Sequence, residues 1–202
     1  MNKIKIAITG GIGSGKSKAL QILNKRGYPT FSCDEIYKSI INTEEYIALI
    51  KKHFPACICN NQVDRTKLAT LIFENPKKRA LLNELAHPLI LKSLFTEMTN
   101  AKNQIAFAEV PLLFEENLED RFDRVIVVTR GRSNRVQAIQ LRDNLPQEAI
   151  EKRILAQFDY SSKDAIERFK KCNAIIIENN GNLLNLEKQI DNALISIMQY
   201  QM

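Results

Sequence analysis

Hydrophobic positions follow two different spacings along the chain, and these spacings predict its fold class. Five short apolar runs are rich in β-branched residues, and they cover residues 5–9, 28–31, 105–109, 124–129 and 174–178. Unbroken apolar runs of this length are typical of strands that are buried on both faces of a parallel sheet. We therefore predict an α/β fold built on a five-stranded parallel sheet.

Apolar residues three or four positions apart, the spacing of a helix with one buried face, fill most of the chain between these runs. Residues 16–26 are expected to form a helix that ends before Gly27, with Leu20 and Leu23 on one face. A final helix is expected to turn the following side chains toward the core: Leu186, Ile190, Ala193, Leu194, Ile197 and Met198.

Roughly 70 residues separate the second and third predicted strands, which is too many for one crossover connection. Asp64 is expected to begin one helix, and Asn75-Pro76 supplies the N-cap and first residue of the next. Because Pro88 disfavours helical backbone at His87, we predict a turn there and a third helix over 89–98. The chain is thus expected to be a single domain, 1–202, with a helical subdomain inserted at about 35–103.

Residues 10–17 read Gly-Gly-Ile-Gly-Ser-Gly-Lys-Ser, a complete phosphate-binding loop between a predicted strand and a predicted helix. The main chain that can curl around the phosphates of a nucleoside triphosphate belongs to Gly11, Ile12, Gly13, Ser14 and Gly15. Lys16 can reach the β- and γ-phosphates, and the Ser17 hydroxyl can bind Mg²⁺. The sequence therefore predicts that ATP and Mg²⁺ bind at this loop, with a helix N-terminus beneath the phosphates.

Two acidic residues follow predicted strands, and the carboxyl ends of strands face the ligand crevice of an open α/β sheet. Glu109 ends the third strand and is expected near the substrate and the water shell of the metal. Asp34 follows the second strand, where it can accept a hydrogen bond from an attacking hydroxyl as a general base. N-capping a helix near Glu35 is the ordinary alternative for Asp34, and the two roles are compatible.

The segment 130–171 carries many positive charges: Arg130, Arg132, Arg135, Arg142, Arg153, Lys163, Arg168, Lys170 and Lys171. Most of these side chains are expected to lie on the solvated side of a helical hairpin. Phosphoryl transfer also needs cations against the charge of the transferring group. We therefore expect one to three of the arginines to face the nucleotide, and the segment to act as a lid.

The composition of the chain excludes some classes of partner but does not indicate a function by itself. The formal net charge is +6 and aromatic residues make up 7% of the chain. The positive charge suits a polyanionic ligand, but the aromatic residues do not interleave with the basic segment as stacking platforms for nucleic acid would. No apolar run approaches the roughly 18 residues of a membrane span, and no secretory leader is recognisable. We expect a cytoplasmic protein with reduced cysteines and neither a membrane nor a nucleic-acid partner.

Together these residues resemble the dephospho-CoA kinase family over nearly the whole chain. The resemblance rests on motifs in the family's order: residues 9–17, Asp34, residues 63–65, Leu82-Asn83 with His87-Pro88, residues 110–115, Arg142-Asp143, Arg153-Ile154 with Ala156-Gln157, and Ile177 with Asn179 and Gly181. The Pro-Leu-Leu-Phe-Glu stretch within residues 110–115 is more specific than the phosphate-binding loop. The resemblance implies ATP- and Mg²⁺-dependent phosphorylation of the ribose 3′-hydroxyl of dephospho-CoA, the last step of coenzyme A synthesis.

The resemblance also implies roles for single residues. Asp34 matches the family's general base, and Arg142 matches a lid arginine that acts in catalysis beside Lys16. Asn179 lies in the segment that lines the adenine pocket. Arg65 and His87 match the substrate subdomain, although packing or capping is an equally good reading of His87.

Some positions depart from the family pattern. Ser32 replaces an aspartate, Lys18 replaces a hydroxyl residue of the loop and brings a positive charge to the nucleotide, and Ala138 replaces an arginine. Arg135 stands where a glutamine is usual, which suggests that lid charges have been redistributed. A catalytically impaired relative is therefore one alternative. A P-loop kinase of another small molecule or nucleotide is the other, although the long insertion favours a bulky acceptor.

Overall fold

The computed structural model describes residues 3–199, which form both strands and helices. The strands are β1 (Ile4–Thr9), β2 (Thr30–Ser32), β3 (Ile58–Cys59), β4 (Gln62–Val63), β5 (Ile105–Glu109), β6 (Arg124–Thr129) and β7 (Ile175–Glu178). The α-helices are α1 (Lys16–Lys25), α2 (Cys33–Ile40), α3 (Glu44–His53), α4 (Arg65–Glu74), α5 (Pro76–Asn100), α6 (Arg132–Asp143), α7 (Gln147–Leu155), α8 (Lys163–Lys171) and α9 (Leu183–Gln199). Short 3₁₀ turns occupy Pro55–Cys57 and Glu119–Arg121.

The predicted five-stranded parallel sheet is confirmed. Its strand order is β2-β5-β1-β6-β7, and β1 pairs in parallel with both β5 and β6. β1 and β5 lie in the middle of the sheet, which explains their unbroken apolar runs: Ile6, Ala7 and Ile8 are fully buried. The phosphate-binding loop therefore leaves the sheet at its central strand, where neighbouring strand ends can contribute to the same site.

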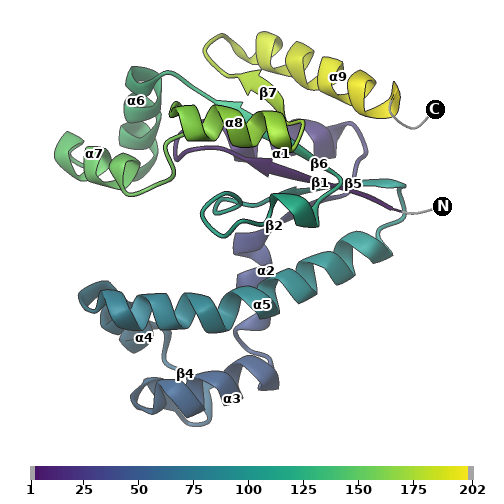
Figure 1. Ribbon diagram of the computed structural model, residues 1–202. Helices are drawn as coiled ribbons and strands as arrows, with labels where there is room; N and C mark the ends of the chain where they lie inside the picture. Colours follow the sequence, from purple (N-terminus) through teal and green to yellow (C-terminus); the bar gives the residue numbers. More distant parts are fainter. Residues whose placement is uncertain (1–2, 200–202) are drawn as a thin grey trace. The chain divides into compact units, whose positions relative to one another are not determined.

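Chain contacts divide the protein into two compact units, one formed by residues 1–30 and 101–202 and the other by residues 31–100. In the first unit, α1 and α9 cover one face of the sheet, and α8 lies on the opposite face (Figure 1). The α1/α9 face holds the main core, in which Leu23 and Ile190 pack with the strand residues Ile6 and Phe107. The predicted last helix is present, but Met198 is 45% exposed, so its expected place in the core is wrong.

β7 is an edge strand, and its exposed edge is partly blocked by a side chain. The N–H of Asn179 donates to Thr129 on β6, so main-chain groups at alternate residues, including Glu178, point away from the sheet. The side-chain amide of Gln189 on α9 makes both hydrogen bonds that a further strand would make there, accepting from the Glu178 N–H at 2.9 Å and donating to the Glu178 carbonyl at 2.8 Å. Such a side chain disfavours edge-to-edge pairing between copies.

The second unit is built on α5, which packs against α2, α3 and α4. Its helix α5 corrects two sequence predictions, because residues 76–100 form one continuous helix with Pro88 inside it, and His87 lies within this helix rather than at a turn. Pro88 removes one helical hydrogen bond. Packing on both sides of it holds the helix together, since Leu82 and Ala86 before it and Leu94 and Met98 after it are buried.

The prediction that this unit is helical throughout is also wrong in one place. β3 and β4 form a short antiparallel hairpin. Asn60 and Asn61 connect the two strands, and both have positive φ angles, 48° and 59°. Positive φ at both central residues is the requirement of a type I′ turn, and asparagine tolerates it better than most residues.

Candidate functional site

The loop between β1 and α1 has a backbone that only glycine accepts at several positions. Gly13 and Gly15 have φ angles of 77° and 102°, in the region that side chains disfavour. A Cβ atom at Gly15 would lie 2.3 Å from the Asn179 amide nitrogen, and one at Gly13 would lie 2.9 Å from the Arg135 carbonyl oxygen. The loop is therefore both tightly curled and closely packed by segments from β7 and α6.

Lys16 and Ser17 start α1 directly after this curl, as the sequence predicts. Lys16 is buried, with 8% of its surface exposed, and its ammonium donates to the Gly11 carbonyl at 3.2 Å. A bond from the lysine to its own loop holds the side chain over the concave face of the loop. A buried ammonium at the N-terminus of a helix is an arrangement that favours a polyphosphate.

Ser17 and Glu109 meet at the carboxyl edge of the sheet. The Ser17 hydroxyl donates to Glu109 Oε1 at 3.1 Å, and Glu109 is 8% exposed at the end of β5. This hydroxyl and carboxylate are the hard oxygen donors that Mg²⁺ prefers. Among residues 3–199 there is no group of three or more His, Cys, Asp or Glu side chains that could hold a metal ion by itself. The pair thus fits a magnesium ion that takes its remaining ligands from water and phosphate, the usual arrangement in nucleotide sites.

Helix α6 crosses the loop and brings arginines to it. Arg142, near the end of α6, pairs in a bidentate manner with Asp143 at 2.7 and 2.9 Å. That hydrogen bonding raises the pKa of Arg142, and the charges of Asp143 and Glu109 raise it further. Arg142 is therefore a permanent cation within the electrostatic influence of the Ser17–Glu109 pair. The predicted lid arginine and the predicted metal site are in the same unit of the protein.

Arg135, about two turns earlier on α6, contacts the loop itself. Its Nε donates to the Ile12 carbonyl at 2.9 Å, and a Cβ atom at Gly11 would lie 2.5 Å from its Nη2. Burial lowers the pKa of Arg135 from its ordinary value, although the group remains charged at neutral pH. Ala138 has no charge. The α6 arginine that contacts the loop is Arg135.

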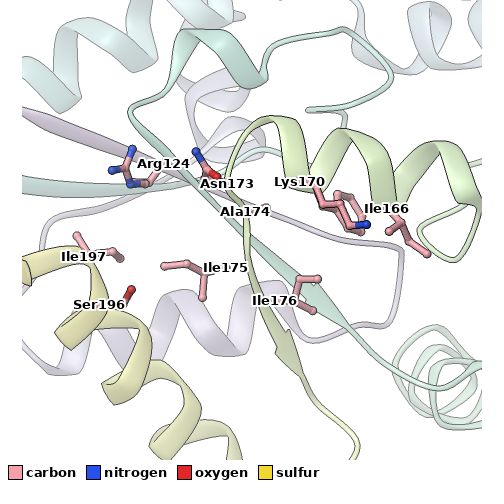
Figure 2. Close-up of a pocket in the computed structure, with 10 residues that line it drawn as sticks. Arg124, Ile166, Lys170, Asn173, Ala174, Ile175, Ile176, Ser196 and Ile197 are labelled. Carbon is pink, nitrogen blue, oxygen red and sulfur yellow. The ribbon is translucent and has the colours of Figure 1, made fainter. Parts of the chain in front are cut away.

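A cleft of about 590 Å³ opens beside the loop. Gly11 and Ser14 from the loop line it, together with Arg130 from the β6–α6 connection, Arg132 and Arg135 from the start of α6, and residues 157–161 from the α7–α8 connection. Its walls are thus rich in positive charge and in main chain. A second cavity, of about 510 Å³, lies beside β7 between α8 and α9 and includes Arg124 and Lys170 (Figure 2). No residue of the phosphate-binding loop lines this second cavity, so it is separate from the candidate site.

Asn179, which follows β7, contacts the loop from the other side. Its amide nitrogen donates to the Ser14 carbonyl at 2.8 Å. Lys18, by contrast, is exposed on the first turn of α1, and its N–H donates to the Gly15 carbonyl at 3.0 Å. The structure thus brings together Lys16, Ser17, Glu109 and Asn179 at one loop, while Arg142 interacts with that group through the charge of Glu109. The nucleotide-binding roles that the sequence predicts for them stay predictions.

The other predicted site residues belong to the second unit. Asp34 is exposed in the first turn of α2, and the helix is N-capped at Ser32, so the expectation that Asp34 is the N-cap is wrong. Arg65 is exposed at the start of α4, where Asp64 is the N-cap residue and accepts from the Lys67 N–H at 3.0 Å. His87 is half-buried on α5. Their roles toward an acceptor stay predictions.

Sequence reasoning gave no role at the loop to the connection between α7 and α8. The Gln157 side chain accepts from the Ile12 N–H at 2.6 Å, and the Tyr160 and Thr9 hydroxyls are hydrogen bonded at 2.9 Å. Burial raises the pKa of Tyr160 to about 12. The partners are 145 and 151 residues apart, so no local pattern predicts their contact.

Comparison with known proteins shows the family of this chain. A sequence model of the dephospho-CoA kinase family matches residues 4–185. Curated dephospho-CoA kinases include one from Thermus thermophilus, 31% identical over 96% of this chain and 92% of the relative. Another, from Fusobacterium nucleatum, is 32% identical over 95% of this chain and 97% of the relative.

Solved structures give the same result. A crystal structure from Thermus thermophilus has a TM-score of 0.79 and 30% identity, and it covers 97% of this chain and 98% of that one. The dephospho-CoA kinase from Campylobacter jejuni has a TM-score of 0.68 and 26% identity over 98% of each chain. A shikimate kinase from Acinetobacter baumannii shares only the fold, with a TM-score of 0.55 at 15% identity over 99% of this chain and 96% of that one. The family match and these relatives place the chain in the dephospho-CoA kinase family.

Proposed function

We propose that this protein transfers the γ-phosphoryl group of ATP to the ribose 3′-hydroxyl of dephospho-CoA and so produces coenzyme A. The observation that carries the proposal is the family match over residues 4–185 together with a complete phosphate-binding loop, in which Lys16 is buried and Ser17 is paired with Glu109. The product then differs from the substrate by one phosphate on the ribose.

The donor side of the reaction follows from the first unit. Main-chain N–H groups of the loop bind the phosphates, and the Lys16 ammonium lies against the transferring group. Mg²⁺, when bound beside Ser17 and Glu109, offsets the negative charge of the phosphates. Arg142 has to leave Asp143, or share it, to approach the γ-phosphate, and Arg153 is already 3.4 Å from the same Asp143 carboxylate. The ion pair with Asp143 therefore fixes the position of the Arg142 guanidinium while leaving it accessible to solvent.

The acceptor side rests on Asp34. Asp34 is an exposed carboxylate in the first turn of α2. An ionised carboxylate can orient the 3′-hydroxyl and accept its proton as the bond to phosphorus forms. Arg65 and His87 are proposed to contact the acceptor. Ser32 replaces the second acidic residue of the family pattern, so Asp34 alone carries the base role.

No helix within residues 3–199 is long and apolar enough to cross a membrane. A cytoplasmic location, and the absence of a nucleic-acid partner, stay part of the proposal rather than findings.

A product assay tests the function directly. The purified protein is incubated with ATP, Mg²⁺ and either dephospho-CoA, AMP, CMP or shikimate, and the products are identified by mass spectrometry. We expect one added phosphate on the ribose of dephospho-CoA and little product from the other acceptors. The Lys16→Ala variant is the control, with a rate loss on the order of 10³-fold. A folded protein that binds ATP but leaves dephospho-CoA unmodified would contradict the proposal and favour the impaired-relative alternative.

A further inference from the structure

Ile12, in the middle of the phosphate-binding loop, has both of its main-chain polar groups bonded to side chains from residues 130–171. Its N–H donates to Gln157 Oε1 at 2.6 Å, and its carbonyl accepts from Arg135 Nε at 2.9 Å. The two side chains come from different elements, Arg135 from α6 and Gln157 from the connection that follows α7.

Both side chains are themselves held in place. Phe158, next to Gln157, donates its N–H to Glu115 Oε1 at 3.0 Å, and its ring stacks on Phe114 with centroids 5.2 Å apart. Tyr160 is hydrogen bonded to Thr9 at the end of β1. The chain on the C-terminal side of Gln157 is therefore fixed to the sheet, and the amide can reach Ile12 in only a narrow range of orientations.

Arg135 is fixed by the packing of α6 on the loop. Gly11 has no side chain, and the Arg135 guanidinium occupies the space that a Cβ atom there would need, 2.5 Å from Nη2. The next glycine, Gly13, lies so close to α6 that a Cβ atom would be 2.9 Å from the Arg135 carbonyl oxygen and 3.0 Å from Ile139. Glycines on both sides of Ile12 thus allow the close approach of α6.

We propose that Gln157 and Arg135 are positioning residues that clamp the Ile12 peptide and so preorganise the loop for the triphosphate of ATP. Glycines flank Ile12, and glycine-rich backbone loses much conformational entropy when it is ordered. A loop that is already ordered before the nucleotide arrives binds it more tightly, because this entropy is not lost on binding. The clamp also links the loop to α6, which carries Arg142, so it connects nucleotide binding to that helix.

The alternative to a clamp is a block, in which Gln157 competes with a phosphate oxygen of ATP for the Ile12 N–H. The two differ in their effect on ATP affinity, and we call the second a plug. Removal of a plug tightens ATP binding, whereas removal of a clamp weakens it. The sign of the change in ATP affinity thus separates the two. This inference deepens the proposed function at the same site and rests on it for the kinetic readout only.

The test compares Gln157→Ala with Gln140→Ala, which removes an exposed glutamine on α6, and follows three quantities. Hydrogen exchange of the Ile12 amide in the nucleotide-free protein is expected to be about three- to tenfold faster in Gln157→Ala only. The KM for ATP is expected to rise by about the same factor, because one loop hydrogen bond is lost. The KM for dephospho-CoA is expected to stay at the wild-type value.

Four further variants keep the inference testable if Gln157→Ala folds poorly: Gln157→Glu, Arg135→Ala, Gly11→Ala and the double variant Gly11→Ala/Arg135→Ala. Gln157→Glu keeps an acceptor oxygen, so Ile12 stays protected from exchange, while its negative charge beside the triphosphate raises the KM for ATP. The double variant Gly11→Ala/Arg135→Ala is expected to be no worse than Arg135→Ala, because the Cβ atom at Gly11 then meets no guanidinium. Gly11→Ala alone is expected to resemble Arg135→Ala in its KM for ATP.

Unchanged exchange at Ile12 in Gln157→Ala, tighter ATP binding, or an additive effect of the double variant would each overturn the clamp. ATP affinity can be measured by calorimetry without turnover. An enzyme that fails to modify dephospho-CoA would therefore refute the proposed function, while exchange and calorimetry would still decide the clamp.

Discussion

Replacing Tyr160 by Phe should destabilise the unit that holds the phosphate-binding loop, and by an amount that depends on pH in a defined way. The Tyr160 hydroxyl is hydrogen bonded to the Thr9 hydroxyl at 2.9 Å, and Thr9 is fully buried. The Phe variant leaves the Thr9 hydroxyl buried without this partner. An unsatisfied buried hydroxyl costs about 1–3 kcal/mol, so we expect the free energy of unfolding at pH 8 to fall by about that amount.

The pH dependence follows from the pKa of Tyr160, which burial raises from 10.0 to about 12. Between these values the unfolded chain loses the phenolic proton while the folded protein keeps it. The stability that Tyr160 contributes is therefore complete below pH 10 and is lost as the pH rises through 12. Each pH unit in this range removes about 1.4 kcal/mol. The stability difference between wild type and variant should thus shrink by about 1.4 kcal/mol between pH 8 and pH 11.

Denaturant unfolding of both proteins at pH 8 and pH 11 measures this difference. Tyr28→Phe is the matched control, because Tyr28 packs edge-on against Phe107 in the same unit and its hydroxyl makes no hydrogen bond that the structure of residues 3–199 shows. A Tyr160→Phe protein as stable as wild type at pH 8, or a stability difference that stays constant up to pH 11, would refute the reasoning. The first result would deny the Thr9 hydrogen bond, and the second would deny the raised pKa.

Three other substitutions test the remaining contacts. Asp34→Asn should lower kcat by about 10²-fold or more while calorimetry shows unchanged ATP binding, since the amide cannot accept a proton; an unchanged kcat would remove the base role. Arg142→Ala should lower kcat/KM for ATP by at least about tenfold with the melting temperature nearly constant, because the Arg142 side chain is 61% exposed; normal kinetics would show that another residue supplies the lid charge. Gln189→Ala should promote self-association in analytical ultracentrifugation relative to Gln140→Ala, because it uncovers the main-chain groups of Glu178 on the β7 edge; a monomeric variant at high concentration would show that the edge needs no such cover.

The sheet could be predicted from the sequence because its signal is local and strong. The runs at 105–109 and 124–129 match β5 and β6 to the residue, since the continuous apolar stretch inside each run is typical of a strand buried on both faces. The phosphate-binding loop could be predicted for the same reason. Its glycines, Lys16 and Ser17 are consecutive or nearly so in the chain, so their spacing in the sequence determines their relative positions in the loop.

The predictions that failed depend on contacts far apart in the chain. Pro88 ends a helix by local rules, but packing before and after it outweighs one lost hydrogen bond, so α5 continues. The contacts that Gln157 and Tyr160 make with the loop need the α7–α8 connection to fold back on β1, which no periodic pattern encodes. Arg135 was recognisable as a candidate from its charge alone. Its bond to the Ile12 carbonyl depends on where α6 crosses the loop.

The residues proposed for the donor and for the acceptor are divided between the two units. Lys16, Ser17, Glu109 and Arg142 belong to the unit of residues 1–30 and 101–202, whereas Asp34 belongs to the unit of residues 31–100. If the proposed roles hold, ATP binding should depend on the first unit alone, whereas proton removal from the acceptor should also need Asp34 of the second unit. This division explains why substitutions should separate cleanly: changes at the Ile12 clamp should act on the KM for ATP, and changes at Asp34 should act on kcat. A variant of Asp34 that weakened ATP binding as strongly as turnover would show that the two functions are not divided in this way.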